Sequence, residues 1–321
     1  MLEKYIGAID NQSVAQKKNN FKLEEVCSAP EPVKWVEKTD WIKYPIRNQN
    51  GSSQCVCMTL ATEMGILFKQ KYGTFIDFTS AFPYQQRGDT SQGGCTSNDV
   101  YSIFPKIGNV FESFMPSQNL HEAEVMAIEL RNYYKDLAKV FTVKRIELPI
   151  DFETVASTVQ ATGKGVMVWF KFSAPEWTDT PQVLPQPTTS GHSVTVVDFL
   201  LKNGKKYLVI QDSWGLQYAI NGYRLISEEY FNARCYLASY LKTFETLDTT
   251  VATRPKFDGT IVSLQKCLKW EGLFPANVAE VESYGNITKQ AVIAFQKRYG
   301  ITPILGVFGS ITKAKLYLLY P

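Results

Sequence analysis

The sequence predicts an α+β protein in which a helical half is followed by a β-rich half and then by a small helical domain. Apolar residues recur at helical spacing from Cys55 to Tyr134, and β-branched, strand-like runs replace them from Val140 onward. Amphipathic helical patterns return after residue 257. With 321 residues and 45% hydrophobic content, the chain is long enough for two domains that each bury a core.

The helical half begins with a cysteine that follows a tight turn. Gly51-Ser52-Ser53 precede Cys55, and the run from Met58 to Phe68 has apolar residues at helical spacing and no proline. We therefore expect Cys55 to begin a buried helix. A thiol with an ordinary pKa near ~8.5 is a weak nucleophile at neutral pH, and a helix N-terminus together with a neighbouring imidazolium favours its thiolate.

The β half offers the imidazole and a carboxylate at the edges of strand-like runs. His192 precedes the run Ser193 to Val197, and the run Tyr207 to Ile210 leads into Asp212. The continuous apolar run Val166 to Phe170 predicts a further strand. We expect Asp212 to accept a hydrogen bond from one imidazole nitrogen, which turns the other nitrogen toward the thiol.

The order and spacing of these residues resemble the papain-like cysteine peptidases. Gln49 lies six positions before Cys55, His192 follows Cys55 by 137 positions, and Asp212 comes 20 residues later. In that family the nucleophile lies near the start of the mature enzyme and the base about 130 to 150 residues downstream. The resemblance covers roughly residues 40 to 240 and is extended by two fragments, Asp212-Ser213-Trp214-Gly215 in place of the usual Asn-Ser-Trp-Gly and Asn221-Gly222-Tyr223.

The resemblance implies a two-lobed peptidase with a helical lobe that carries the cysteine and a β-barrel-like lobe that carries the histidine. It implies four catalytic residues: Cys55 as nucleophile, His192 as base, Asp212 as its orienter, and Gln49 as a donor to the oxyanion. The chain departs from the family at Val56, where a tryptophan is usual, and at Asp212, whose charge should raise the pKa of the histidine. Cys57 remains an alternative nucleophile.

Four residues are expected to bind substrate: Gly93, Gly94, Gly191 and Trp214. The pair Gly93-Gly94 resembles the glycines that line the family's main specificity pocket, where an extended peptide can approach the backbone closely. A simple surface turn is the alternative for this pair. Trp214 is expected to shield the hydrogen bond between histidine and aspartate, and Trp177 with the proline-rich residues 180–187 forms a loop that is a further candidate for the cleft wall.

The C-terminal region resembles the three-helix peptidoglycan-binding domain. Leu264-Gln265, then Thr288 to Gln296, then Gly306-Val307-Phe308-Gly309 and Thr312 follow that family's signature in order. The predicted domains are an N-terminal extension at 1–30, a peptidase domain at 31–245, a Thr-rich and proline-ended linker at 246–256, and the helical domain at 257–321. The alternative for the last region is a small helical bundle without a ligand.

Composition excludes several other classes. The net charge of +3 is mixed and does not favour nucleic acid, and His and Cys do not cluster at metal-ligand spacing, so neither a metal nor a cofactor is expected. Ser52 occupies the place of a disulfide-bonded cysteine in many relatives, which favours a reducing compartment. Neither a signal peptide nor a membrane span is expected, and the polar stretch Asn11 to Asn20 predicts a solvated arm, with occlusion of the cleft as the alternative.

The sequence therefore predicts a cysteine endopeptidase that acts through an acyl-thioester and is directed to bacterial cell wall. The expected partners are a peptide or protein substrate and peptidoglycan. The location expected without a signal peptide is virion-associated, as in a bacteriophage lysin, or outside the cell after lysis or non-classical export. The alternatives are a phage or virion structural protein that keeps a non-catalytic peptidase fold and a transferase that uses the same acyl-enzyme.

Overall fold

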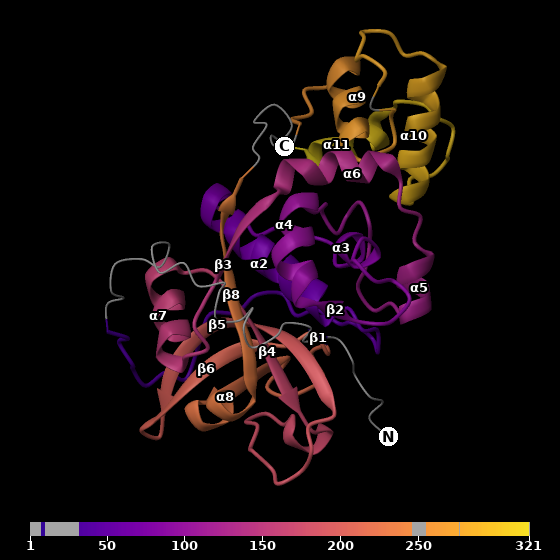
Figure 1. Cartoon of the computed structure of the whole chain (residues 1–321). Helices are drawn as coiled ribbons and strands as arrows, with labels where there is room; N and C mark the ends of the chain where they lie inside the picture. The colour runs from indigo at the N-terminus through magenta and orange to yellow at the C-terminus, as the bar shows by residue number, and fades with distance from the viewer. Residues whose placement is uncertain (1–7, 10–31, 246–254, 276, 321) are drawn as a thin grey trace. The chain divides into compact units, whose positions relative to one another are not determined.

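The computed structural model describes residues 8–9, 32–245, 255–275 and 277–320, and Figure 1 shows their helices and strands. The chain divides into two compact units, residues 1–246 and residues 247–321. The predicted extension at 1–30, which includes the arm from Asn11 to Asn20, lies outside the described residues except for Ala8 and Ile9. The predicted linker at 246–256 lies outside them except for its last two residues.

The predicted buried helix is the central helix of the first unit. Helix α2 spans Cys55–Tyr72, and every residue from Cys55 to Phe68 is buried. The helix is buried around its whole circumference, polar Thr59, Thr62 and Glu63 included, and it packs against the strands β4, β5 and β8 described below. The helix ends at Gly73, which adopts the left-handed conformation that favours glycine at this position.

Short helices complete the helical lobe between α2 and the sheet. Their bounds are α3 Ala81–Gln85, η2 Asp99–Ile103, α4 Phe104–Ile107, α5 Glu122–Ala127, α6 Asn132–Ala138 and η3 Lys139–Phe141. A cluster of aromatic rings fills the space between this lobe and the sheet. Phe78, Phe111, Phe141 and Phe244 contact one another with ring centroids 5.0 to 6.2 Å apart, which is the range in which aromatic pairs are favourable.

The β lobe is a six-stranded antiparallel sheet with the strand order β3-β8-β4-β5-β6-β7. The strands are β3 Val143–Glu147, β4 Val166–Phe172, β5 Ser190–Lys202, β6 Lys205–Gln211, β7 Tyr223–Ser227 and β8 Cys235–Phe244. Helices α7 Phe152–Thr162 and α8 Glu228–Arg234 lie beside it, with the short helix η4 Ala174–Glu176 (Figure 1). Strand β4 is buried at every position except Lys171, because both faces of the sheet are covered there.

A short parallel pair lies outside this sheet. Strand β1, Ala8–Ile9, pairs in parallel with β2, Cys95–Thr96. The carbonyl oxygen of Ala8 accepts a hydrogen bond from the Tyr236 hydroxyl at 3.0 Å. It also lies where a side chain on Gly191 would be, 2.4 Å from an added Cβ. The backbone of Gly191 is therefore approached closely by an extended stretch of the same chain.

The second unit contains the three predicted helices, α9 Ile261–Trp270, α10 Asn286–Arg298 and α11 Ser310–Leu319. Its core contains Leu264, Val292, Phe295 and Leu316, each of them fully buried. Two buried glutamines repeat one bonding pattern. The amide nitrogen of Gln265 donates to Thr288 Oγ1 at 2.9 Å, and that of Gln296 donates to Thr312 Oγ1 at 3.0 Å.

Each of these glutamines also holds the loop that follows its own helix. Gln265 accepts from the backbone N–H of Val281 at 2.7 Å, and Gln296 accepts from that of Gly306 at 2.9 Å. The glutamines of the sequence signature thus satisfy the polar groups of loops that would otherwise be buried without partners. None of the helices that the structure describes has the length and apolar character that crossing a membrane requires.

Candidate functional site

Cys55 is the first residue of α2 and is completely buried. Gln54 occupies the N-cap position, but its side chain makes no hydrogen bond to the first turn of the helix. The N–H groups of that turn are therefore not taken up by a capping side chain. The partial positive charge of a helix N-terminus favours a thiolate. Cys57, the alternative nucleophile, makes a different contact: its Sγ lies 3.7 Å from Sγ of Cys95, and burial raises the pKa of the Cys57 thiol.

His192 lies on β5 and is held by Asp212, which follows β6. Nε2 of His192 lies 2.7 Å from Oδ1 of Asp212. An ionised carboxylate only accepts hydrogen bonds, so Nε2 carries the proton in this pair. Nδ1 is buried and has no hydrogen bond within the described part of the chain. That nitrogen is therefore available to a group on its other side.

The charges around the imidazole favour its protonated form. Burial by itself would lower the pKa of His192, but the charge of Asp212 and its hydrogen bond, with a smaller effect of the Cys55 thiol, raise this pKa to about 9. Burial would likewise raise the pKa of Asp212, but His192 and Arg224 hold it well below its ordinary value. The arrangement is that of an imidazolium between a carboxylate and a thiol.

Gln49 is anchored to both sides of the site. Its backbone N–H donates to the carbonyl of Ser213 at 2.8 Å, and its side-chain carbonyl accepts from the Ser213 hydroxyl at 2.7 Å. Its amide nitrogen donates to the carbonyl of Ser52 at 2.5 Å. These bonds orient the amide, because only its nitrogen can donate and only its oxygen can accept. The orientation leaves a second amide hydrogen for another acceptor.

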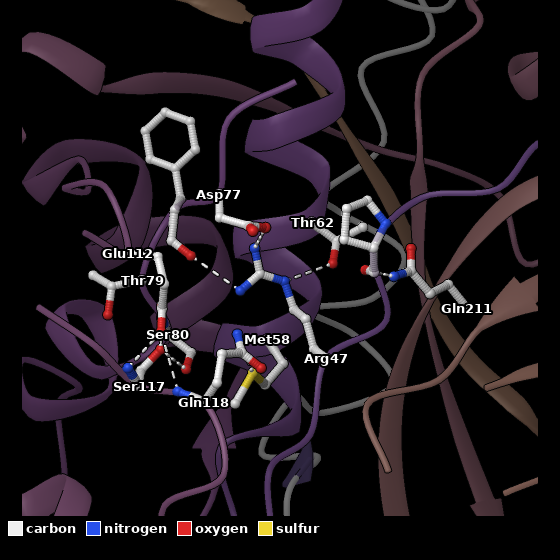
Figure 2. A network of polar contacts seen from close by, with 12 residues as sticks. Arg47, Met58, Thr62, Asp77, Thr79, Ser80, Glu112, Ser117, Gln118 and Gln211 are labelled. Atoms are coloured by element: carbon white, nitrogen blue, oxygen red, sulfur yellow. Dashed lines mark hydrogen bonds and ion pairs between the residues drawn. The ribbon is translucent and has the colours of Figure 1, made fainter. Parts of the chain in front are cut away.

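A buried arginine fixes the segment that precedes Gln49, as Figure 2 shows. Arg47 donates to Thr62 of α2 at 3.1 Å, to the carbonyl of Phe78 at 3.0 Å and to Asp77 at 2.9 Å. The carbonyl of Arg47 accepts from the N–H of Gly215 at 3.0 Å. One side chain thus links the residues before Gln49 to the helix that begins with Cys55.

The predicted substrate-binding residues lie at several places around these groups. Gly93 lies against Ser53, two residues before Cys55, and an added Cβ there would be 2.7 Å from the serine oxygen. Gly94 donates its N–H to the Tyr84 hydroxyl at 3.1 Å. Gly191 directly precedes His192 on β5, beside Ala8. The structure therefore brings the glycine pair, Gly191 and the imidazole to the neighbourhood of α2 and β5.

Two tryptophans pack around the imidazole. The ring centroid of Trp214 lies 5.3 Å from that of His192, and the ring centroid of Trp177 lies 5.5 Å from it on perpendicular planes. Trp177 also donates its indole N–H to Oδ2 of Asp212 at 2.9 Å. Trp177, which the sequence suggested only as a cleft wall, is thus a direct partner of the carboxylate.

A pocket of about 290 Å³ is lined in part by Asn48 and Gly215, the sequence neighbours of Gln49 and Trp214. Backbone and side chains from three segments line it: Pro45 to Asn48, Gln118 with Asn119, and Gly215 to Gln217, together with Asp77. Four of the ten lining residues, Asn48, Gln118, Asn119 and Gln217, carry amide side chains. Among the described residues, three or more His, Cys, Asp or Glu side chains nowhere gather in a way that could hold a metal ion.

Comparison with known proteins assigns families to parts of the chain. Residues 138–243 match the model of the papain family of cysteine proteases, and residues 258–316 match the model of a peptidoglycan binding domain. The chain contains a papain-family cysteine protease domain and a peptidoglycan-binding domain. The protease match includes His192 and Asp212, whereas Gln49 and Cys55 precede it. The comparison with curated proteins found no match.

Solved structures confirm the predicted papain-like α+β fold of the protease domain. Xylellain, a cysteine protease from Xylella fastidiosa, shares 15% identity with a TM-score of 0.61, over 75% of this chain and 97% of that chain. Procathepsin B S9 from Trypanosoma congolense shares 16% identity with a TM-score of 0.52, over 68% of this chain and 84% of that chain. The cysteine protease and lectin-like domains of Cwp84 from Clostridium difficile share 14% with a TM-score of 0.54, over 68% and 55%.

Arg224 contacts the candidate site and was not among the residues that the sequence predicted. It lies on β7, directly after the predicted fragment Asn221-Gly222-Tyr223, and is 2% exposed. Its Nε donates to Oδ2 of Asp212 at 2.8 Å. A signal was present in the sequence: a buried carboxylate needs a cation nearby, and Arg224 is the charged residue in an otherwise apolar strand.

Proposed function

We propose that the chain is a cysteine endopeptidase that hydrolyses peptide bonds through an acyl-thioester on Cys55. The observation that carries the proposal is the orientation of His192, whose Nε2 is engaged by Asp212 and whose buried Nδ1 is left for the thiol. The Cys55 thiol lies close enough to contribute to the raised pKa of His192. A thiolate and an imidazolium held in this way form an activated nucleophile.

We assign one or two residues to each step of the proposed reaction. The thiolate of Cys55 attacks the scissile carbonyl carbon. The developing oxyanion accepts hydrogen bonds from the free amide hydrogen of Gln49 and from the backbone N–H of Cys55. His192 donates its Nδ1 proton to the leaving amine, which departs and leaves the acyl-thioester. Nδ1 then takes a proton from water as the water attacks the thioester, and the Cys55 thiolate leaves, which restores the thiolate and imidazolium of the starting state.

The proposed substrate is an extended peptide lying along Gly93, Gly94 and Gly191, with Trp214 on the leaving-group side. Support for strand addition comes from β1, since Ala8 and Ile9 already pair with Cys95 and Thr96 directly after the glycine pair. Main-chain pairing of this kind gives affinity, and pockets for side chains give specificity. The amide-lined pocket at residues 215–217 is suited to polar groups of the leaving peptide.

The second unit is proposed to hold the enzyme on bacterial cell wall. It matches a peptidoglycan binding domain over residues 258–316, and residues 256–321 carry eight Lys and Arg against four Asp and Glu. Such a charge favours an anionic wall polymer. Cwp84, a surface layer associated protein, likewise has a cysteine protease domain and a lectin-like domain. Binding through a second site raises the local concentration of substrate.

Thiol alkylation tests the catalytic part of the proposal. Iodoacetamide is added to the full chain at neutral pH, and the modified cysteines are mapped by mass spectrometry over time. Cys55 is expected to react first and to lose this advantage in His192→Ala. Cys57 is the internal control, because it is as buried and lies on the same helix. Labelling of Cys55 no faster than of Cys57 contradicts the proposal.

Cosedimentation tests the second part. The full chain and a chain that ends at residue 246 are mixed with purified peptidoglycan sacculi and with a casein substrate. Retention of the full chain, loss of retention on truncation and equal casein cleavage by both are expected. Equal sedimentation of the two chains contradicts a wall-binding role of residues 247–321.

A further inference from the structure

The carboxylate of Asp212 is saturated with hydrogen-bond donors. Oδ1 accepts from Nε2 of His192 at 2.7 Å and from the N–H of Ser213 at 2.7 Å. Oδ2 accepts from the indole of Trp177 at 2.9 Å and from Nε of Arg224 at 2.8 Å. A carboxylate offers about four acceptor positions, so each one has a donor. An asparagine side chain has one acceptor oxygen and would turn its own N–H₂ group toward one of these donor pairs.

Arg224 is held in place from several directions. Its Nη1 donates to the carbonyls of Trp177 at 3.0 Å and Thr178 at 2.8 Å. Its guanidinium also lies near two indoles, 5.1 Å from the ring centroid of Trp177 and 5.4 Å from that of Trp214. Planar stacking and several directed donors are the properties that distinguish arginine from lysine. The cation is therefore placed on Asp212 by the strand, the preceding loop and both rings.

We propose that Arg224 is a positioning residue of the protease site, which makes an aspartate workable where an asparagine is usual by offsetting part of its charge and fixing its orientation toward His192. The inference rests on the proposed function for its consequence in catalysis. The part of the inference that concerns the pKa of His192 does not depend on that function. The charged and titratable groups that face Asp212 come from three elements, namely His192 on β5, Arg224 on β7 and, beyond the imidazole, Cys55 on α2.

The net charge of this group of side chains explains the effect. An unpaired Asp212 would stabilise the imidazolium so strongly that His192 would donate its proton reluctantly. Arg224 withdraws part of that attraction, because it shares the carboxylate with His192. The nearby carboxylate of Glu176, next to Trp177 in sequence, is engaged by Arg234 at 2.5 Å and does not replace Asp212. Arg224 thus weakens the attraction of Asp212 for the imidazolium without cancelling it, and the His192 pKa stays raised.

The test uses the imidazole itself. The chain has two histidines, so ¹⁵N-histidine NMR of the full chain in a His121→Gln background reports His192 alone. Arg224→Gln should raise the pKa of His192 by about one pH unit, and Asp212→Asn should lower it by at least as much. The double variant should lie between the two single variants. Arg145→Gln is the matched control, because the Arg145 side chain is as buried as that of Arg224 and pairs with Glu63.

The outcomes separate the inference from the proposed function. An unchanged His192 pKa in Arg224→Gln, as expected for Arg145→Gln, overturns the inference even if the enzyme cleaves peptides. A shifted pKa supports it even if no substrate is found. If Arg224→Gln does not fold, Arg224→Lys is measured instead, because lysine keeps the positive charge but not the forked guanidinium. The His192 pKa of this variant should stay near that of the wild type. A fall of this pKa as large as that in Asp212→Asn refutes the inference.

Catalysis gives the second measurement. In Asp212→Asn, Arg224 is a buried cation that has lost its partner, and adding Arg224→Gln removes it. The double variant should therefore have a kcat/KM for a peptide substrate roughly tenfold above that of Asp212→Asn alone, because the two residues belong to one ion-pair network and their effects are coupled. A further loss in the double variant contradicts the inference. The comparison is made between variants, so a difference in folded fraction is removed by active-site titration with an alkylator.

Discussion

The protonation of His192 predicts how the stability of the protease domain depends on pH. Its pKa is raised to about 9 in the folded protein, against 6.5 in the unfolded chain. The native state therefore holds a proton that the unfolded chain releases at lower pH. The stabilisation is fully present below pH 6.5 and is lost as the pH rises through about 9. A difference of this size corresponds to about 3 kcal/mol for a completely buried group.

Urea unfolding at several pH values between 6 and 10 measures this effect. Tryptophan emission follows the protease unit, because five of the six tryptophans lie in residues 1–246. The free energy of unfolding of the wild type should fall by about 3 kcal/mol relative to that of His192→Gln across this window. Other groups titrate in both proteins, so the comparison with the variant removes their contribution.

His121→Gln is the matched control for this prediction. His121 is exposed at the start of α5, so its replacement should leave the pH dependence of the wild type unchanged. Parallel curves for the wild type and His192→Gln would refute the reasoning, because His192 would then not be held as an imidazolium by Asp212. The same curves would also withdraw the support that this charge gives to a thiolate at Cys55.

Two predictions concern packing and buried polar groups. Gly108→Ala should destabilise the protease unit by about 3 kcal/mol or more in thermal unfolding, since Gly108 has φ +69° and an added Cβ would lie 1.8 Å from the carbonyl oxygen of Ala138. The control is Gly73→Ala. Gly73 has φ +80° but open space around it, so this change should cost about 1 kcal/mol in the same assay. Gln265→Leu should lower the free energy of unfolding of the second unit by about 2 kcal/mol, because three polar groups of the loop and helix lose their hydrogen-bond partner. Gln290→Leu, on the exposed face of α10, is the control and should change this free energy little when both variants are measured by calorimetry.

The sequence predicted the elements whose pattern is local. The helix that begins at Cys55, the strand that carries His192 and the three C-terminal helices all follow from residue periodicity, and the structure has each of them. The papain-like fold and the peptidoglycan-binding region were predicted from short motifs and are confirmed. Such features are encoded within about 20 neighbouring residues, which is why reading along the chain suffices.

Two features that depend on distant partners were not predicted. The pairing of Ala8 and Ile9 with Cys95 and Thr96 joins segments more than 80 residues apart, and two residues are too few for a strand pattern. Arg224 was missed because an arginine in a strand is usually solvated, and its burial depends on Asp212 and Trp177. Burial of a charge is decided by its partner, so it becomes visible only when the tertiary structure places both.

The register of the sheet gives the two units different folding problems. Strand β3 pairs with β8, and Val143 lies opposite Phe244. These two strands are separated by about a hundred residues of chain, so they can pair only after a long loop has been closed. The bonds of Gln265 and Gln296 join residues only 23 and 16 positions apart. Chains with local contacts fold in microseconds to milliseconds, and those with distant pairings in milliseconds to seconds. The C-terminal unit, although it follows the protease domain along the chain, should therefore reach its native structure first.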